Sequence, residues 1–239
     1  MDILYIIIPA YNESANIEHV LADWYPVIEK HNGAGASRLV IINDGSRDDT
    51  YALVRKSMEK HPMLLAVTQE NAGHGAAILR GYKYALSKNA DFIFQTDSDG
   101  QTLPGEFEDF WNLRKKCDMA IGWRRNREDG AGRIFVTHVL KAVIRVMFRV
   151  SVRDANTPYR LIKAETLKKY MHLIPERYFL TNVLISVIFV KKGCKVRFLP
   201  ITFRPRQGGV NSINIRKIMR TGINALYDFR VLNAKIERE

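Results

Sequence analysis

Two carboxylates one residue apart, Asp97 and Asp99, follow the short and mostly apolar segment Phe92–Gln95. Such a segment predicts a buried strand that delivers both side chains to a turn. Because residues i and i+2 of an extended chain point the same way, both carboxylates can address one hard cation, which in turn can hold substrate phosphates. An acidic pair in a loop is more often a solvated turn. Its place at a strand end favours the metal site, since ligands of open α/β sheets collect there.

The first hundred residues alternate between expected strands and expected helices, with polar or glycine-containing turns between them. This rhythm predicts an α/β fold: a doubly wound, mainly parallel sheet flanked by helices. We expect the strands at residues 4–9, 38–42, 64–68 and 92–95.

Three polar segments follow the first, second and fourth expected strands. They are Pro9-Ala-Tyr-Asn-Glu13, Asn43-Asp-Gly-Ser46 and Asp97-Ser-Asp-Gly-Gln101. In a parallel sheet these segments meet at one edge, where a nucleotide would bind. The pair Gly73-x-Gly75 follows the third strand and lacks the third glycine of a dinucleotide fingerprint. It predicts instead a tight turn that brings a helix N-terminus close to a ligand or to the sheet.

The pattern after residue 101 is less regular. We expect helices at 103–117 and 134–150, a strand at 119–122 and an amphipathic helix at 215–236. The longest apolar run, 183–190, predicts a core helix or strand and is too short to span a bilayer. Lys141, Arg145 and Arg149 form a basic stripe at four-residue spacing in the second of these helices. The stripe suits either a membrane-surface helix or a core-packed helix with a solvated edge.

The formal charge of +12 is unevenly distributed. Residues 1–100 hold 9 Lys and Arg against 13 Asp and Glu, whereas residues 101–239 hold 28 against 12. This asymmetry indicates an anionic partner for the second half, such as phosphates or an anionic membrane surface, unless the charge only serves solubility. No recognisable nucleic-acid-binding pattern is present, so we expect no nucleic acid partner. The 2 cysteines suit a reducing compartment, so we expect a cytoplasmic protein.

The segments PAYNE, NDGS and DSDGQ, in this order and spacing, resemble the nucleotide-binding half of a family 2 inverting glycosyltransferase with a GT-A fold. The segments 154–161 (DANTPYRL) and 203–206 (FRPR), with Gly209 and Ser212, resemble those of dolichyl- and polyprenyl-phosphate sugar synthases. The resemblance covers about residues 3–214 and is strongest up to residue 101. It implies a GT-A domain at 1–214, with a nucleotide-binding half at 1–101 and an acceptor-side half at 102–214. Residues 215–239 would form a C-terminal amphipathic helix associated with a membrane or a dimer.

The resemblance also implies an activity: inverting transfer of a single sugar from a UDP- or GDP-sugar to polyprenyl phosphate, at the inner face of the membrane. Mg²⁺ or Mn²⁺ would be the cofactor, bound by Asp97, Asp99 and Gln101, with Ser98 in the donor site between the two carboxylates. Pro9, Tyr11 and Glu13 would surround the nucleoside, and Asp44 would accept a hydrogen bond from the base or ribose. Phosphate charge would be neutralised by Arg124 and Arg206, which Arg160 or Arg204 could join.

The nature of the acceptor depends on the supply of general bases. A sugar hydroxyl needs a base, whereas a phosphate monoester is already largely ionised near neutral pH. Asp154 is a possible base or orienting group, and only five carboxylates follow it: Glu165, Glu176, Asp228, Glu237 and Glu239. This scarcity favours a lipid phosphate.

Other readings of the sequence stay open. Thr157-Pro158 and Asn214 depart from the pattern of the synthases, so another lipid-linked acceptor, or a saccharide hydroxyl in cell-surface glycan assembly, is an alternative. A non-catalytic basic module that binds membrane or nucleotide is an alternative of another class. The sequence also leaves open whether the chain forms a homo-oligomer.

Overall fold

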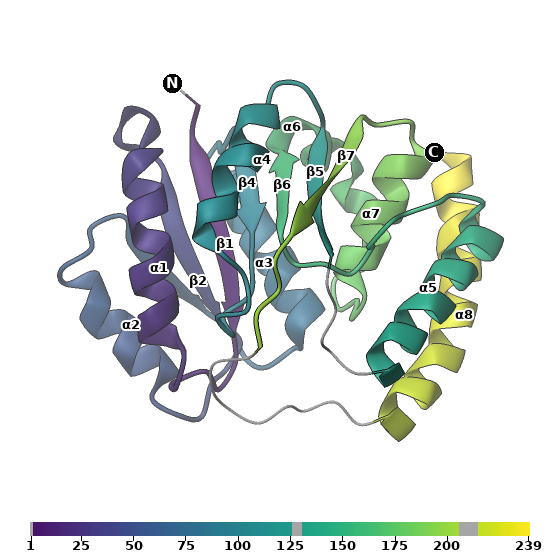
Figure 1. Ribbon diagram of the computed structural model, residues 1–239, viewed down its shortest axis with the longest axis horizontal. Coiled ribbons are helices and arrows are strands. Elements are labelled where there is room, and N and C mark those ends of the chain that lie inside the picture. The colour runs from purple at the N-terminus through teal and green to yellow at the C-terminus, as the bar shows by residue number, and fades with distance from the viewer. Residues whose placement is uncertain (1, 126–130, 206–214) are drawn as a thin grey trace.

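A single seven-stranded mixed sheet forms the centre of the molecule, in the order β3-β2-β1-β4-β6-β5-β7 (Figure 1). The computed structural model describes residues 2–125, 131–205 and 215–239, without the side chains of residues 34, 131–136 and 215–225. The strands are β1 (Leu4–Ala10), β2 (Arg38–Asn43), β3 (Leu64–Thr68), β4 (Phe92–Gln95), β5 (Met119–Arg124), β6 (Arg160–Lys163) and β7 (Val196–Ile201).

The predicted parallel sheet is confirmed for β1 to β4. β1 pairs in parallel with β2 and β4, and β2 pairs in parallel with β3. The sequence did not predict β6 and β7. β6 lies antiparallel between β4 and β5, and β7 extends the sheet parallel to β5. Since β4 and β5 both run opposite to β6, β5 and β7 end at the same edge as the first four strands.

Helices cover both faces of the sheet. The expected helix at 103–117 is shorter in the structure, because Pro104–Glu106 forms a 3-10 turn and the amides of Arg114 and Lys116 bond three residues back. The apolar run at 183–190 is helical. The helices are α1 (Ile17–Lys30), α2 (Thr50–Met58), α3 (His74–Ser87), α4 (Phe107–Leu113), α5 (Ala131–Phe148), α6 (Ala164–Tyr170), α7 (Thr181–Lys191) and α8 (Ile215–Arg238).

Each face of the sheet has its own hydrophobic core. In β1, Leu4, Ile6 and Ile8 belong to the core formed with α1 and α4. Tyr5 and Ile7 point to the opposite core, which includes α3, α5, α7 and α8. Burial on both faces explains why the strands of a doubly wound sheet are almost continuously apolar.

The last helix packs on the body of the molecule next to α5 (Figure 1). Phe229, Leu232 and Ile236 are buried, and the ring of Phe229 lies 5.1 Å from that of Phe148 in α5. The inner faces of both helices are therefore part of the core. Within the described ranges, no helix has the length and apolar character that crossing a membrane requires.

Candidate active site

The loops after β1 and β2 are held together by hydrogen bonds. The amide of Asn12 donates to Ser46 Oγ at 3.1 Å, and Asn12 Oδ1 accepts from the amide of Arg47 at 2.8 Å. Asn12 adopts a left-handed backbone conformation, with φ 54°, which asparagine tolerates better than most residues. The amide of Glu13 donates to Thr50 Oγ1. These contacts place the first two polar segments side by side, as the sequence predicts.

Three residues of the first segment differ in exposure. Pro9 is buried inside β1, and Glu13 is also buried, with its carboxylate accepting from Asn16 Nδ2 at 2.7 Å. Tyr11 is 42% exposed at the strand-end edge, an unusual setting for a large aromatic side chain. An aromatic ring displayed in this way offers a surface on which a base can stack.

Asp44, which follows β2, is buried and already has hydrogen-bond partners. Its Oδ1 accepts from Gln69 Nε2 at 2.7 Å and from the amide of Ala72 at 2.9 Å, and its Oδ2 accepts from the amide of Gly73 at 2.9 Å. Asp44 therefore holds the loop that leads from β3 into α3. A carboxylate oxygen accepts two hydrogen bonds, so Oδ2 has room for a donor from a ligand.

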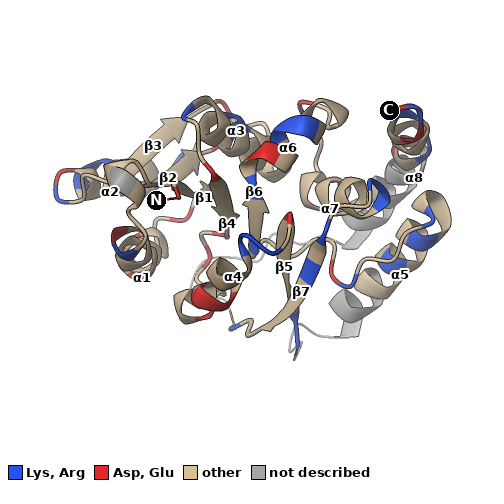
Figure 2. Cartoon of the chain, turned by 90° about the horizontal axis from the view of Figure 1, so that it is seen from above, with Lys and Arg blue, Asp and Glu red and all other residues tan. Residues whose placement is uncertain are grey.

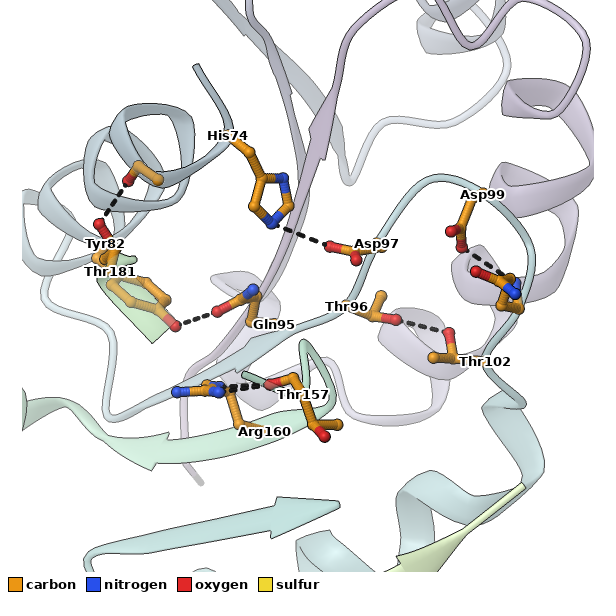
Figure 3. Close-up of polar contacts among 12 residues, drawn as sticks. His74, Tyr82, Gln95, Thr96, Asp97, Asp99, Thr102, Thr157, Arg160 and Thr181 are labelled. Atoms are coloured by element: carbon orange, nitrogen blue, oxygen red, sulfur yellow. Dashed lines mark hydrogen bonds and ion pairs between the residues drawn. The ribbon is translucent and has the colours of Figure 1, made fainter. Parts of the chain in front are cut away.

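The acidic loop after β4 is closed at its base by two hydroxyls. Thr96 Oγ1 and Thr102 Oγ1 are 2.6 Å apart, and the amide of Gln101 donates to Asp99 Oδ1 at 3.2 Å (Figure 3). Gly100 has φ 70°, a conformation that favours glycine. Asp97 and Asp99 are partly exposed, and the intervening Ser98 is buried. The loop thus presents both carboxylates at the strand-end edge.

His74, which the sequence analysis did not single out, contributes to the same edge. It is the first residue of α3, and its Nε2 lies 3.6 Å from Asp97 Oδ1 (Figure 3). The segment after β3 ends at the same edge as the acidic loop, so a polar residue next to Gly73 could have been included on that ground. The N-terminus of this helix lies against the start of α7, where the carbonyl of Gly75 accepts from Thr181 Oγ1, and its approach to a ligand stays a prediction.

The carboxylates of Asp97 and Asp99 are suitable ligands for a divalent cation, although they do not supply a complete set of ligands. Within the described ranges, no three His, Cys, Asp or Glu side chains are grouped closely enough to hold a metal by themselves. Asp97 Oδ1 is buried, however, and no described group donates a hydrogen bond to it. A buried carboxylate oxygen in this state is costly unless a cation or ligand satisfies it. Hard carboxylate oxygens suit Mg²⁺ and Mn²⁺.

Gln101 links the acidic loop to the chain that leaves β7. Its Nε2 donates to the carbonyl of Arg204 at 2.8 Å, and its own carbonyl accepts from the amide of Arg204 at 2.8 Å. The guanidinium of Arg204 lies 3.7 Å from Asp23. Arg204 is thereby brought to the edge that carries the acidic pair. Arg206, the next arginine of this segment, lies outside the described residues.

Arg124, the last residue of β5, forms a two-pronged ion pair with Asp154. Nε lies 3.0 Å from Asp154 Oδ2, and Nη2 lies 3.1 Å from Oδ1. Both side chains are largely buried, and the guanidinium also lies 5.2 Å from the ring centre of Phe203. Such a pair fixes the orientation of the guanidinium. The structure therefore favours the orienting role of Asp154 over that of a general base.

Arg160 begins β6 opposite Gln95, the last residue of β4, so it lies at the edge, but its guanidinium is occupied by protein acceptors and its contact with substrate phosphate stays a prediction. It is fully buried, and its guanidinium donates to the carbonyl of Thr157 (Figure 3). It also donates to the carbonyls of Ala155 and Asn182 and to Ser186 Oγ. Burial lowers the pKa of Arg160, an effect that the charges of Asp154 and Asp97 partly offset. Arg160 thus holds the loop before β6 against the start of α7.

The fold has close counterparts among solved structures. Glucosyl-3-phosphoglycerate synthase from Mycobacterium tuberculosis, in complex with Mn²⁺ and UDP-glucose, matches 95% of this chain and 79% of its own, with a TM-score of 0.69 and 17% sequence identity. The same enzyme with phosphoglyceric acid matches with a TM-score of 0.70. At this identity the likeness concerns the fold, which is that of the GT-A glycosyltransferases.

The family follows from the sequence comparison. The model of glycosyl transferase family 2 matches residues 5–234, nearly the whole chain. The protein belongs to this family and is a family 2 glycosyltransferase, which confirms the class that the three polar segments predict.

The curated relatives include enzymes that act on lipid phosphates. Polyprenol monophosphomannose synthase from Mycolicibacterium smegmatis is 26% identical over 226 residues, covering 90% of this chain and 83% of the relative. A dolichyl-phosphate beta-glucosyltransferase from Trichomonas vaginalis is 34% identical over 114 residues, covering 46% of this chain and 32% of the relative. Dodecaprenyl-phosphate galacturonate synthase from Rhizobium johnstonii is 23% identical, covering 93% of this chain and 65% of the relative. These names describe the substrates of the relatives.

Proposed function

We propose that this glycosyltransferase transfers one sugar, with inversion at the anomeric carbon, from a UDP- or GDP-sugar to a polyprenyl phosphate, in a reaction that depends on Mg²⁺ or Mn²⁺. The observation that carries the proposal is the acidic loop after β4, which presents Asp97 and Asp99 at the sheet edge with one buried carboxylate oxygen lacking a hydrogen bond. The names of the lipid-phosphate relatives support the acceptor, and the Mn²⁺ and UDP-glucose complex of a fold neighbour supports the donor and the metal.

The donor site is assigned to the edge formed by β1, β2 and β4. Pro9 and Glu13 shape the loop from which Tyr11 offers its ring to the base, and Asp44 accepts from the base or ribose through Oδ2. Ser98, which is buried and lies between the two carboxylates in the sequence, is part of the same donor site. Asp97 and Asp99 hold the cation with Gln101, and donor phosphate oxygens complete its ligands. A cation bound there neutralises negative charge on the leaving diphosphate.

Arginines on or just after the neighbouring strands stabilise the same negative charge on the leaving diphosphate. Negative charge builds on the leaving diphosphate as the bond to the sugar breaks, so fixed positive groups stabilise the transition state more than the ground state. Arg124 is held for this task by Asp154, and Arg204 by the backbone contacts with Gln101. Arg206 is proposed to join them.

The acceptor side needs no protein base. The oxygen of a lipid phosphate is already anionic near neutral pH and attacks the anomeric carbon without losing a proton to the enzyme. Asp154, the carboxylate that the sequence offers as a base, is occupied by Arg124. This pairing favours a phosphate acceptor over a sugar hydroxyl. An acceptor of this kind resides in a membrane, so we place the enzyme at the cytoplasmic face of one.

The test is a transfer assay with purified protein, a panel of labelled UDP- and GDP-sugars, Mg²⁺ or Mn²⁺, and a short-chain polyprenyl phosphate. We expect label from one donor to enter the organic phase only when metal and lipid phosphate are both present. Donor hydrolysis without a lipid product, or transfer to a saccharide without added lipid, would overturn the proposed acceptor and leave the glycosyltransferase assignment intact.

A further inference from the structure

Exposed apolar side chains are concentrated on the two helices at the end of the molecule away from α1 and α2 (Figure 1). Of the 7 large apolar side chains that the structure records as exposed among the described residues, all but Tyr11 and Phe179 lie on α5 or α8. Single exposed apolar residues are normal, but a group of them on adjacent elements marks an interaction site. The group consists of Val139, Val146, Leu226, Tyr227 and Val231.

These side chains are not a loosely packed part of the core. The opposite faces of the same helices are already buried, through Ile144 and Phe148 in α5 and through Phe229 in α8. Val146 and Tyr227, by contrast, are 75% and 74% exposed. The two helices therefore have an apolar inner face that the fold uses and a partly apolar outer face that the fold does not use.

The outer face of α5 is also basic. Arg145 and Arg149 are exposed beside Val146, and α8 exposes Arg230 beside Val231. Figure 2 shows the Lys and Arg positions along α5 in blue. The sequence of α5, residues 131–148, contains no Asp or Glu. Near the end of α8, Glu237 is engaged by Lys191 at 2.8 Å. Residues 226–239 hold three basic residues against Asp228, Glu237 and Glu239, so the excess of positive charge beside the apolar groups comes from α5.

The combination of exposed apolar side chains and arginines indicates what binds to this surface. Apolar side chains flanked by arginines match the interface of an anionic lipid bilayer, where the apolar groups enter the headgroup region and the arginines pair with lipid phosphates. A second copy of the chain docked face to face would bring like charges together, which opposes association. The observations favour a lipid surface.

The same helices begin next to the site. α5 follows β5, which ends at Arg124, and α8 follows the segment that leaves β7 and includes Arg204. Both strands end at the edge that carries Asp97. Val146, Arg149 and Val231 lie in or just after the second halves of these helices. The ends of both helices contact Lys191 at the far end of α7, so a bilayer docked there lies along the side of the molecule that joins the edge.

We propose that the outer faces of α5 and α8 form one membrane-docking surface, which consists of Val139, Val146, Tyr227, Val231, Arg145, Arg149 and Arg230. The proposal rests on the proposed function for its purpose, since a lipid acceptor must be reached in a bilayer. The binding itself requires neither nucleotide nor acceptor, so it is tested separately.

The experiment is flotation of the full chain with two kinds of vesicle, one of phosphatidylcholine alone and one with about a third phosphatidylglycerol. We expect binding to the anionic vesicles that weakens with salt. The pair Arg145→Gln and Arg149→Gln, and separately the pair Val146→Ser and Tyr227→Ser, should each lower the partition coefficient by about tenfold or more. The matched control, Arg55→Gln with Lys56→Gln on the exposed side of α2, removes the same charge and should retain binding.

Three results would overturn the surface: no binding of the wild type to anionic vesicles, equal losses in the α2 control, or unchanged binding in both the arginine pair and the apolar pair. A dimer in light scattering that Tyr227→Ser dissociates would identify the face as a contact between copies instead. Failure of the proposed function has a different signature, because the wild type would then bind vesicles but make no product from a short, water-soluble prenyl phosphate. Transfer to that acceptor should be unchanged in the surface variants.

Discussion

The two halves of the sheet edge handle charge in opposite ways. On the side of β1 to β4 the charged groups are carboxylates: Asp44 accepts from backbone amides, and Asp97 Oδ1 has no hydrogen bond from a described group and lies 3.6 Å from His74. On the side of β5 to β7, charged groups are arginines that other residues orient, as Asp154 orients Arg124. A cation and the phosphates of a donor fit between such halves. The difference indicates that the first half receives positive charge and the second half negative charge.

The largest effect should come from removing one carboxylate of the acidic pair. Asp99→Asn keeps the size of the side chain but removes the charge, so we expect transfer to fall by about 10³-fold, as when a key electrostatic group of an active site is lost. Melting temperature should stay within the error of the wild type. Asp109→Asn, at an exposed position of α4, is the matched control. Activity retained in Asp99→Asn would remove the metal role from this residue.

A second large effect, on stability, separates Arg160 from Arg124 and Arg204. Arg160→Met leaves the carbonyls of Ala155, Thr157 and Asn182 without their donor, so the free energy of unfolding should fall by about 3 kcal/mol. Urea denaturation measures this loss. Arg197→Met, at an exposed position of β7, should change little. A stable Arg160→Met enzyme that has lost activity would return Arg160 to the donor site.

The carboxylate-rich half of the sheet edge, β1 to β4, and the arginine-rich half, β5 to β7, also differ in how well the sequence predicts them. The segments after β1, β2 and β4 were placed correctly at one edge because regular β-α alternation implies a parallel sheet, whose strand ends meet. The strand β6 was missed because it is short, contains the buried Arg160 and runs antiparallel, which only its neighbours determine. β7 contains Pro200, which indicates an edge strand rather than a central one.

Side-chain orientation was the other limit. The sequence pattern around Arg160 indicated a positive charge in this segment. It did not indicate where the side chain points, because that depends on contacts with α7. The apolar run at 183–190 left helix and strand open because α7 is buried on nearly all sides and has no polar face to set a period. His74 was missed because its importance lies in a contact with Asp97 across the edge. The roles of the edge residues in binding stay predictions.

The contact between α3 and α7 joins the two halves of the molecule, and we expect a substitution there to have a smaller effect on stability. A Cβ at Gly75 would lie 2.0 Å from the carbonyl oxygen of Tyr178 and 2.9 Å from Thr181 Oγ1. Gly75→Ala should therefore push α3 away from α7 and lower the free energy of unfolding by about 2 kcal/mol. His74 would move with the helix, so KM for the donor should rise.

The matched control is Gly105→Ala, where an added Cβ meets no atom within 4 Å. Differential scanning calorimetry and initial rates at varied donor concentration give both readouts. A Gly75→Ala protein as stable as the control, with an unchanged KM, would show that the approach of the α3 N-terminus to α7 does not position the donor site.

The smallest effect concerns the loops of the first half and depends on pH. Asp48 accepts from the amide of Ser14 at 3.0 Å and from the amide of Thr50 at 3.1 Å. Burial alone raises the pKa of Asp48, but the hydrogen bonds from Thr50 and Ser14 outweigh this effect and lower the pKa to about 2. A carboxyl with a folded pKa below its unfolded value of about 3.9 contributes stability above that value and loses it as the pH falls toward the folded pKa.

The wild type should therefore lose more stability than Asp48→Asn when the pH is lowered from about 5 to about 2.5, within the window that the two pKa values define. The difference should be modest, because Asp48 is largely exposed and solvent screens its interactions. Asp49→Asn, at the next exposed position, should follow the wild-type curve. Parallel curves for all three proteins would mean that the loops after β1 and β2 are not joined through the charge of Asp48. Neutral contacts such as Asn12 to Ser46 would then hold the donor half together without it.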